Sequence, residues 1–273
     1  MDTRKFNSLT STEYKKQTRL HWGGHPCGSN DSDKESLSRD YFEEIEHRRY
    51  ESHPWILRAI ECFDLRGKRV LELGYGMGTD HLQLARRGGQ MYGLDLTPAS
   101  GQVTKRRFEL YGFHSELMIG DAEHLPYRDG EFDFVYSFGV VHHSPDTERI
   151  IREIHRVLKP GGKCWITVYH KNSLFFWWTV YLHDWILKGG FCRETLKERI
   201  SRIEYPNDNP HLVIKLYRKK EFAEMFQPFK EVRSTIDHLI HTDLALVGRF
   251  IPKGFLDLLG KRVGWYIVME GTK

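Results

Sequence analysis

Length, composition and charge already exclude several classes of protein. A chain of 273 residues with 40% apolar residues should fold around a sizeable core, which argues against disorder. Its 41 basic and 37 acidic residues nearly cancel, so no dedicated nucleic-acid surface is expected.

The cysteines and the apolar segments limit the metal chemistry and the compartment. The four cysteines lack paired ligand spacing, so neither a metal site nor a disulfide framework is predicted. Residues 1–20 have no apolar signal core, and we expect a cytoplasmic protein. The longest apolar run, 174–187, is shorter than the roughly 20 residues that cross a bilayer. No transmembrane segment is therefore predicted, although this run can lie on a membrane.

The N-terminal elements are predicted to form a cap. Residues 1–36 are rich in turn-forming residues and should be mostly loop with one short helix. Ser38 is a good N-cap for the helix after it, and Pro54 starts a second helix. The basic pair Arg48–Arg49 lies inside this helical region and is interpreted as part of a solvated face. We assign residues 1–50 to the cap.

Short apolar strands and helices alternate along the middle of the chain. The pattern predicts strands at 69–73, 90–94, 116–119, 132–137 and 163–168, and helices at 82–87, 101–111 and 147–157. Strands joined by helical crossovers form a parallel sheet with right-handed connections.

The alternation stops after residue 170. Residues 171–214 are rich first in aromatic and then in charged residues, and are predicted to be a helical insertion that forms a lid over the substrate. A helix at 218–226 follows. Two late strands, 231–236 and 265–269, can pair antiparallel at the sheet edge.

The predicted fold class is α/β. We expect a Rossmann-like, mostly parallel sheet of seven strands with helices on both faces. This domain is built from residues 51–170 and 215–273 and carries the N-terminal cap and the helical insertions.

A predicted strand runs into a glycine-rich turn that opens a helix. Gly74, Gly76 and Gly78 lie in this turn, where backbone N–H groups and a helix N-terminus can face a bound nucleotide. They stand at its first, third and fifth positions, whereas a dinucleotide fingerprint has its third glycine at the sixth, here Thr79. The spacing therefore disfavours a nicotinamide oxidoreductase.

Two acidic residues follow later strands of the predicted sheet. Asp95 ends the second strand, where a carboxylate can accept hydrogen bonds from both ribose hydroxyls of an adenosine. Asp121 follows the third strand, where an adenine amino group can be held. Because the carboxyl ends of parallel strands share one edge, Gly74, Asp95 and Asp121 should converge on one ligand. The alternative is that both carboxylates merely cap the turns after them.

Five motifs occur in a fixed order along residues 68–168. They are Val70-Leu71-Glu72-Leu73-Gly74-x-Gly76-x-Gly78, Gly93-Leu94-Asp95, Gly120-Asp121-Ala122, Phe132-Asp133-Phe134-Val135 and Val157-Leu158-Lys159-Pro160-Gly161-Gly162. The series resembles the motifs of class I S-adenosylmethionine-dependent methyltransferases, and is most similar to their ubiquinone and menaquinone branch. The resemblance implies that S-adenosyl-L-methionine is the cofactor.

The same resemblance assigns roles to individual residues. It implies that the methionine end of the cofactor is served by Glu72, Gly74, Tyr75, Gly76 and Gly78. It further implies ribose contact by Asp95, adenine contact by Asp121 with the Ala122 backbone, and a place for Leu96 in the cofactor site. The site floor would lie at Ser137 and Phe138.

The sequence offers candidates for a general base, although the chemistry does not require one. Methyl transfer from a sulfonium is an in-line displacement in which the cofactor carries the reactive group, so the protein mainly positions the acceptor and excludes water. A hydroxyl acceptor would gain from a base. His142 and His143, after the fourth strand, are the first candidates, followed by Tyr169 and His170. Alternatively, the histidines only order their loop.

Aromatic residues gather outside the cofactor motifs. They lie chiefly between residues 175 and 185 and at Trp22 of the N-terminal cap. They form either an apolar lid over an acceptor pocket or a secondary core. The segment 21–28 is interpreted as folding over the cofactor.

The favoured function is methyl transfer to a small-molecule acceptor. The acceptor atom would be O, N or C of an aromatic, quinone-like or natural-product compound. One alternative is a cofactor-binding scaffold without turnover, and another is a protein or RNA methyltransferase.

Overall fold

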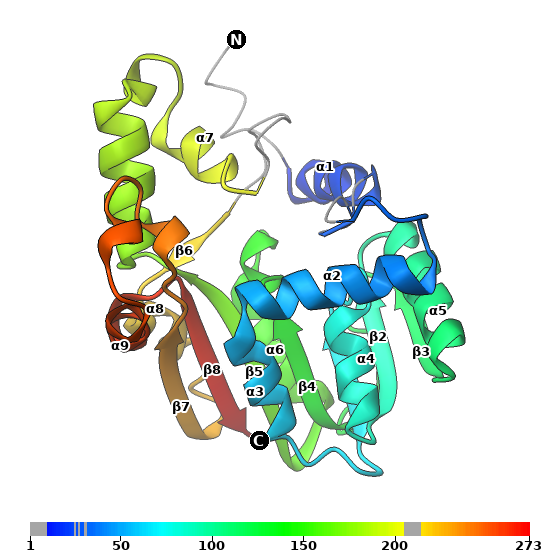
Figure 1. The fold of residues 1–273 in the computed structure, drawn as a ribbon. Coiled ribbons are helices and arrows are strands. Elements are labelled where there is room, and N and C mark those ends of the chain that lie inside the picture. Colours follow the sequence, from blue (N-terminus) through cyan, green and yellow to red (C-terminus); the bar gives the residue numbers. More distant parts are fainter. Residues whose placement is uncertain (1–9, 25, 27, 30–31, 205–213) are drawn as a thin grey trace.

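The computed structural model describes residues 10–24, 26, 28–29, 32–204 and 214–273. Its centre is an eight-stranded sheet (Figure 1). The strands are β1 (Arg69–Leu73), β2 (Gln90–Asp95), β3 (Ser115–Ile119), β4 (Phe132–Phe138), β5 (Leu158–His170), β6 (Leu216–Tyr217), β7 (Lys230–Asp237) and β8 (Tyr266–Thr272). Their order is β3-β2-β1-β4-β5-β8-β7, and β6 pairs with β5. β8 is antiparallel to both neighbours, while the other pairings are parallel.

Helices cover both faces of the sheet (Figure 1). They are α1 (Ser11–Gly24), α2 (Arg39–Ser52), α3 (Pro54–Glu61), α4 (Thr79–Arg86), α5 (Pro98–Tyr111), α6 (Thr147–Val157), α7 (Leu196–Ser201), α8 (Lys219–Glu224) and α9 (Lys253–Val263). The insertion after β5 begins with a π-helix, η3 (Phe175–Leu187). Short 3-10 turns are η2 (Val141–His143), η4 (Gly190–Cys192), η5 (His241–Asp243) and η6 (Gly248–Phe250).

Strand β1 shows how the sheet is buried on both sides. Val70 belongs to the same apolar core as Ile56 of α3, whereas its neighbour Leu71 belongs to the core that contains Ile154 of α6. Successive strand residues point to opposite faces, so a strand covered by helices on both sides reads as a continuous apolar run. The two cores fix the strands, and the loops at their carboxyl ends share one edge.

The predicted fold class is confirmed, with changes in detail. The sheet has eight strands instead of seven, because β6 pairs with β5 over two residues and is too short to give a pattern. β5 begins at Leu158, before the predicted start at residue 163. Leu158 already pairs with Phe132 of β4, and the register then shifts before Phe134 pairs with Lys163. Gly161, with a φ of 77°, lies within this irregular stretch. α1 has 14 residues where the sequence predicts a short helix. The late strands β7 and β8 pair antiparallel as predicted.

A buried ion pair joins the N-terminal cap to the sheet domain. The carboxylate of Asp80 accepts hydrogen bonds from Arg49 Nε at 2.7 Å, Tyr50 at 2.9 Å and Tyr136 at 2.8 Å. The interpretation of Arg48–Arg49 as a solvated face is therefore wrong for Arg49. Burial raises the pKa of Asp80, but the Arg49 guanidinium and the hydrogen bonds outweigh it and lower this pKa below its ordinary value.

Asp80→Asn should destabilise the fold by about 3–5 kcal/mol, because it leaves the Arg49 guanidinium without its counter-charge. The melting temperature should fall by on the order of 10 °C. A depressed carboxyl pKa stabilises the native state above the unfolded pKa, and this stability is lost as the pH falls through the folded pKa. The variant and the wild type should thus converge in acid.

Urea denaturation over a range of pH measures this difference. Asp64→Asn is the matched control, because Asp64 is 73% exposed and its pairs with Arg66 and Lys68 are 3.7 and 4.0 Å long. A loss in Asp80→Asn no larger than in this control would contradict a stabilising role.

Candidate functional site

The glycine turn meets the ends of β2 and β3. The Gly74 N–H donates to Leu94 O at 2.7 Å, and the Gly76 N–H donates to Asp95 Oδ2 at 3.0 Å. The Gly120 N–H donates to Asp95 O at 2.8 Å. The structure therefore brings together the three segments that the sequence predicts to converge, because all of them leave parallel strands at one edge.

The three glycines of the turn are needed for different reasons. All have positive φ, with 73° at Gly74, 48° at Gly76 and 70° at Gly78. A Cβ on Gly74 would lie 2.3 Å from Val140 Cγ2, and one on Gly78 would lie 2.8 Å from Thr104 Oγ1 of α5. A Cβ on Gly76 would have no heavy atom within 4 Å. The turn is thus closely packed from below and open at Gly76.

Asp95 and Asp121 each cap the turn that follows, as the capping alternative expects. Asp95 Oδ1 accepts from the Thr97 N–H, and Asp121 Oδ1 accepts from the Glu123 N–H, both at 2.9 Å. The second oxygen of Asp95 also reaches the Gly76 N–H. Its carboxylate therefore lies between β2 and the glycine turn, where capping alone would not require it.

Helix α1 crosses the carboxyl edge of the sheet above this turn (Figure 1). Lys15 of α1 donates to Asp121 Oδ2 at 2.6 Å and also pairs with Glu123. The sequence gives no local signal for Lys15, because a lysine in a polar helix is expected to be solvated. An adenine amino group at Asp121 would have to share that carboxylate with Lys15.

Glu72 and Tyr75 are buried beneath the turn. Glu72 Oε2 lies 2.8 Å from His81 Nδ1, and burial, with the charge of Asp80, raises the pKa of Glu72 well above its ordinary value. The Tyr75 ring packs on β2 so closely that a Cβ on Gly93 would lie 2.5 Å from it. Tyr75 can therefore contribute to a ligand site mainly through its backbone.

The remaining implied cofactor residues lie along the same edge. Leu96 and Ala122 are half-buried. Ser137 is fully buried, with its hydroxyl 3.3 Å from Leu73 O. The ring of Phe138 lies 4.7 Å from the Arg49 guanidinium, which joins the proposed floor to the buried ion pair.

A histidine and carboxylate cluster lies after β4. His143 Nε2 is 3.1 Å from Glu204 Oε2, and His142 Nε2 is 4.0 Å from Glu204 Oε1. The Tyr169 hydroxyl donates to Glu204, and the Tyr169 ring lies 4.2 Å from that of His142. Trp22 of α1 meets the His143 ring edge-on at 6.0 Å.

The protonation states within this cluster differ. Burial, helped by the neighbouring His143, lowers the pKa of His142 to about 4, so His142 is neutral near neutral pH. Burial alone would raise the pKa of Glu204, but His143 and His142 lower it well below its ordinary value. A neutral histidine and an ionised carboxylate are therefore present together.

The structure separates His170 from this cluster and adds Glu204 to it. His170 Nδ1 is 3.0 Å from Gly264 O, and its side chain is buried, so as a candidate base it would act apart from this cluster. Glu204 stands in the charged part of the insertion, where its sequence neighbours give no sign of a role. The ligand atoms of His142, His143 and Glu204 lie within 4.8 Å of one another, which is also compatible with a metal ion.

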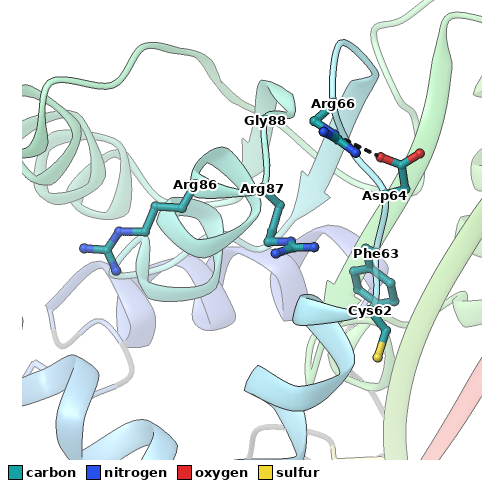
Figure 2. A pocket seen from close by; sticks show the side chains of 7 residues that line it. All are labelled: Cys62, Phe63, Asp64, Arg66, Arg86, Arg87 and Gly88. Carbon is teal, nitrogen blue, oxygen red and sulfur yellow. Dashed lines mark ion pairs between the residues drawn. The ribbon is translucent and has the colours of Figure 1, made fainter.

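One surface pocket lies away from this site. Figure 2 shows it between the loop before β1 and the end of α4, with the ion pair of Asp64 and Arg66 at 3.7 Å on its wall. These residues lie at the amino ends of β1 and β2, whereas ligands of open α/β sheets bind at the carboxyl ends. We therefore do not assign the acceptor to this pocket.

A part of the N-terminal cap lies outside the described residues. His25 and Cys27 of the segment predicted to fold over the cofactor are among these. No described helix combines the length and the apolarity needed to cross a bilayer.

Known proteins resemble this chain in sequence and in fold. A family model described as a methyltransferase domain matches residues 71–166. A Mycobacterium leprae protein named phthiotriol/phenolphthiotriol dimycocerosates methyltransferase is 40% identical over 38% of this chain and 39% of its own length. A protein of the same name, numbered 1, from Mycobacterium ulcerans is 34% identical over 54% of each chain. The matched region thus spans about half or less of these relatives.

Solved structures share the fold at low sequence identity. The PH0226 protein from Pyrococcus horikoshii superposes with a TM-score of 0.58 at 16% identity and covers 93% of this chain and 98% of its own. The [4+2]-cyclase SpnF superposes with a TM-score of 0.54 at 16% identity and covers 96% and 93%. The ubiquinone and menaquinone branch stays a prediction. The family model shows a methyltransferase domain over residues 71–166, and the solved structures show the fold.

Proposed function

We propose that this chain transfers a methyl group from S-adenosyl-L-methionine to a hydroxyl group of a small, largely apolar acceptor. The observation that carries the proposal is the meeting of the glycine turn with Asp95 and the end of β3 at one sheet edge. When bound, the cofactor supplies a methyl group activated by its sulfonium.

The residues at this edge fit an adenosyl ligand. The space above Gly76 is free of protein atoms within 4 Å of a Cβ position, so a ligand can approach the backbone there. Asp95 would accept from the ribose hydroxyls, Asp121 would accept from the adenine amino group, and the backbone of the turn would bind the methionine end. Glu72 would bind an ammonium group as a carboxylate, which requires it to lose a proton.

The proposed proton acceptor is His143. Its Nε2 faces Glu204, which favours the tautomer with the proton on Nε2 and the lone pair on Nδ1. His143 is 9% exposed whereas His142 is fully buried, so His143 is the nearer of the two to the surface, although its Nδ1 is itself buried. Glu204 would hold this ring in place and stabilise its protonated form. A base at this position would assist a hydroxyl acceptor more than an amine, which is why we propose a hydroxyl.

The insertion after β5 supplies the apolar surroundings. Phe176 and Val180 of η3 are buried in the core, and Phe175 meets Trp265 with ring centroids 4.8 Å apart. A lid and a secondary core are the two alternatives that the sequence offers for this aromatic segment. Both can hold, because one side of η3 packs in the core and the other can line a pocket. The names of the mycobacterial relatives refer to methyl transfer onto phthiotriol and phenolphthiotriol dimycocerosates.

Titration calorimetry with S-adenosylmethionine and with its demethylated product tests the cofactor site. Incubation with a library of hydroxylated apolar compounds, read by mass spectrometry, then tests the reaction, and the expected product is heavier by one methyl group. Binding without any methylated product would favour a cofactor-binding protein of another function. The fold itself allows that outcome, since a chain named as a [4+2]-cyclase shares it.

Asp95→Ala should weaken the binding of S-adenosylmethionine by about 100-fold, because hydrogen bonds to a charged acceptor contribute roughly 1.5–3 kcal/mol each. Asp95→Asn keeps the shape and one acceptor oxygen, so its loss should be intermediate. Calorimetry measures both. Asp133→Asn is the control, because Asp133 lies at the amino end of β4 and pairs with Lys159 at 2.8 Å. Unchanged affinity in Asp95→Ala would refute the ribose assignment.

A further inference from the structure

Apolar side chains are concentrated on two insertions near the site. Thirteen large apolar residues are exposed in the described part of the chain, and eight of them lie between 175 and 192 or between 244 and 263. Together they form what we call the insertion surface: Trp177, Leu187, Phe191, Leu246, Val247, Phe250, Phe255 and Leu258. Soluble monomers rarely expose apolar residues in such a concentration unless they bind something there.

The two insertions pack against each other. The Trp178 indole N–H donates to Ala245 O at 2.8 Å, and the Thr179 hydroxyl donates to Asp243 O at 2.5 Å. In Figure 1 the orange segment around η5 and η6 lies beside the yellow-green helix η3, above the end of the sheet formed by β5, β7 and β8. The two segments that carry most of the exposed apolar residues therefore lie side by side (Figure 1).

Several of these residues are exposed in positions where polar residues would fold more favourably. Helix α9 buries Leu256 but leaves Phe255 53% and Leu258 57% exposed, so it is apolar on two sides, unlike an ordinary surface helix. Leu246 is 68% exposed with a φ of 70°, a conformation that suits glycine or asparagine better than a bulky residue. Folding alone does not account for these choices.

The charges beside the insertion surface are mostly positive. Residues 175–193 and 244–263 contain six basic side chains and two acidic ones, Asp184 and Asp257, for a net charge of +4 (6 − 2). Two of the basic side chains are paired, Lys188 with Asp184 at 3.4 Å and Lys261 with Asp237 at 2.8 Å. The basic residues are Lys188, Arg193, Arg249, Lys253, Lys261 and Arg262. Two copies of this surface would repel each other, whereas an anionic surface would attract it. Apolar groups among basic ones are typical of segments that lie in a membrane interface.

A row of aromatic rings runs along η3 from the insertion surface. Successive ring centroids are 5.2, 5.5 and 6.3 Å apart in the order Trp177, Tyr181, Trp185, Phe191. At the start of the same helix, Phe175 meets Trp265, which stacks on Tyr169 beside His142 with centroids 4.5 Å apart. The helix thus links the exposed surface to the histidine cluster.

We propose that the insertion surface docks on an anionic phospholipid membrane. Its apolar side chains enter the boundary between headgroups and acyl chains, and its basic side chains contact the headgroup phosphates. The docking goes beyond the proposed methyl transfer and does not depend on it. Only the passage of an apolar acceptor along η3 toward His143 rests on that function.

Co-sedimentation of the full chain with vesicles tests the docking. One set of vesicles contains phosphatidylcholine alone, and the other contains added phosphatidylglycerol. We expect clear binding to the anionic vesicles, weaker binding to the neutral ones, and a decrease in anionic binding with added salt. Absence of binding to anionic vesicles at low salt would overturn the proposal.

Substitutions separate the apolar and the electrostatic contributions. Phe250→Glu should lower the partition coefficient by at least about tenfold, because Phe250 is 73% exposed and its ring would no longer enter the interface. Arg249→Gln with Lys253→Gln should lower anionic binding by about fivefold per residue and leave neutral binding unchanged. Phe113→Glu, at a 37% exposed residue before β3 on the far edge, is the matched control and should bind as the wild type does.

Two further measurements distinguish membrane docking from self-association and from misfolding. Light scattering reports the oligomeric state, and a dimer that Phe250→Glu dissociates would show that a second copy occupies the surface, which overturns the membrane assignment. Titration of Phe250→Glu with S-adenosylmethionine should give the wild-type affinity, which shows that the variant is folded. If neither the wild type nor any variant binds the cofactor, the proposed function is refuted, whereas the vesicle result stands.

Discussion

Gly76→Val is expected to lower the affinity for S-adenosylmethionine by more than about 100-fold while the protein remains folded. The new side chain would meet no protein atom within 4 Å of its Cβ, so it would project into the open space above the turn. A φ of 48° costs a branched residue roughly 1–2 kcal/mol, which is small beside the stability of a domain. The main loss should therefore appear in binding, because the ligand can no longer approach the backbone.

Gly67→Val provides the matched control. Gly67 also has a positive φ, 70°, and a Cβ there would also have nothing within 4 Å, but it lies before β1 at the opposite edge of the sheet. The two variants should lose similar stability in urea, whereas calorimetry should show normal cofactor binding in Gly67→Val. Equal losses of affinity in both would mean that strain, not obstruction, is the cause, and that the cofactor binds elsewhere.

Gly74→Ala should behave differently from both. Its Cβ would lie 2.3 Å from Val140 Cγ2, so the substitution must displace the loop that precedes His142 and His143. We expect a loss of stability together with the loss of binding. This contrast follows from the structure and not from the motif, which treats the glycines alike.

His143→Ala is expected to lower kcat by about 10²–10⁴-fold with little change in cofactor affinity, because a positioned general base contributes an effect of that size. Steady-state kinetics with a hydroxylated acceptor that the wild type methylates, and calorimetry with the cofactor, measure the two quantities. His155→Ala is the control, since His155, near the end of α6, packs against Phe229, away from the site. Equal turnover in His143→Ala and the wild type would show that His143 is not a general base.

Glu204→Gln tests the positioning role of the carboxylate. It removes the negative charge that stabilises a protonated His143, so the acidic limb of the pH–rate profile should move to lower pH. A purely structural role would lower activity without that movement. Treatment with a chelator is the second test, because activity that is lost and then restored by a divalent ion would show that the cluster binds a metal and would contradict the role of His143 as a base.

Much of the fold and of the cofactor edge could be predicted from the sequence. The glycine turn, Asp95 and Asp121 each follow a predicted parallel strand, and the carboxyl ends of such strands must share an edge whatever the loops do. The periodicity of apolar residues depends on near neighbours, which is why β1, β2 and β4 are predicted within a residue or two. The two-residue β6 carries no such pattern.

Tertiary structure alone decided the partners of the side chains. Glu204 reaches His143 because a long insertion returns to the end of β4, and Lys15 reaches Asp121 because α1 folds across the edge. Arg49 lies in a polar helical segment where an arginine is expected to be solvated, but it pairs with Asp80. Local sequence determines where the helices and strands lie, and their alternation determines which strand ends share an edge of the sheet. Contacts between distant segments depend on the paths of loops and insertions, which local periodicity does not encode.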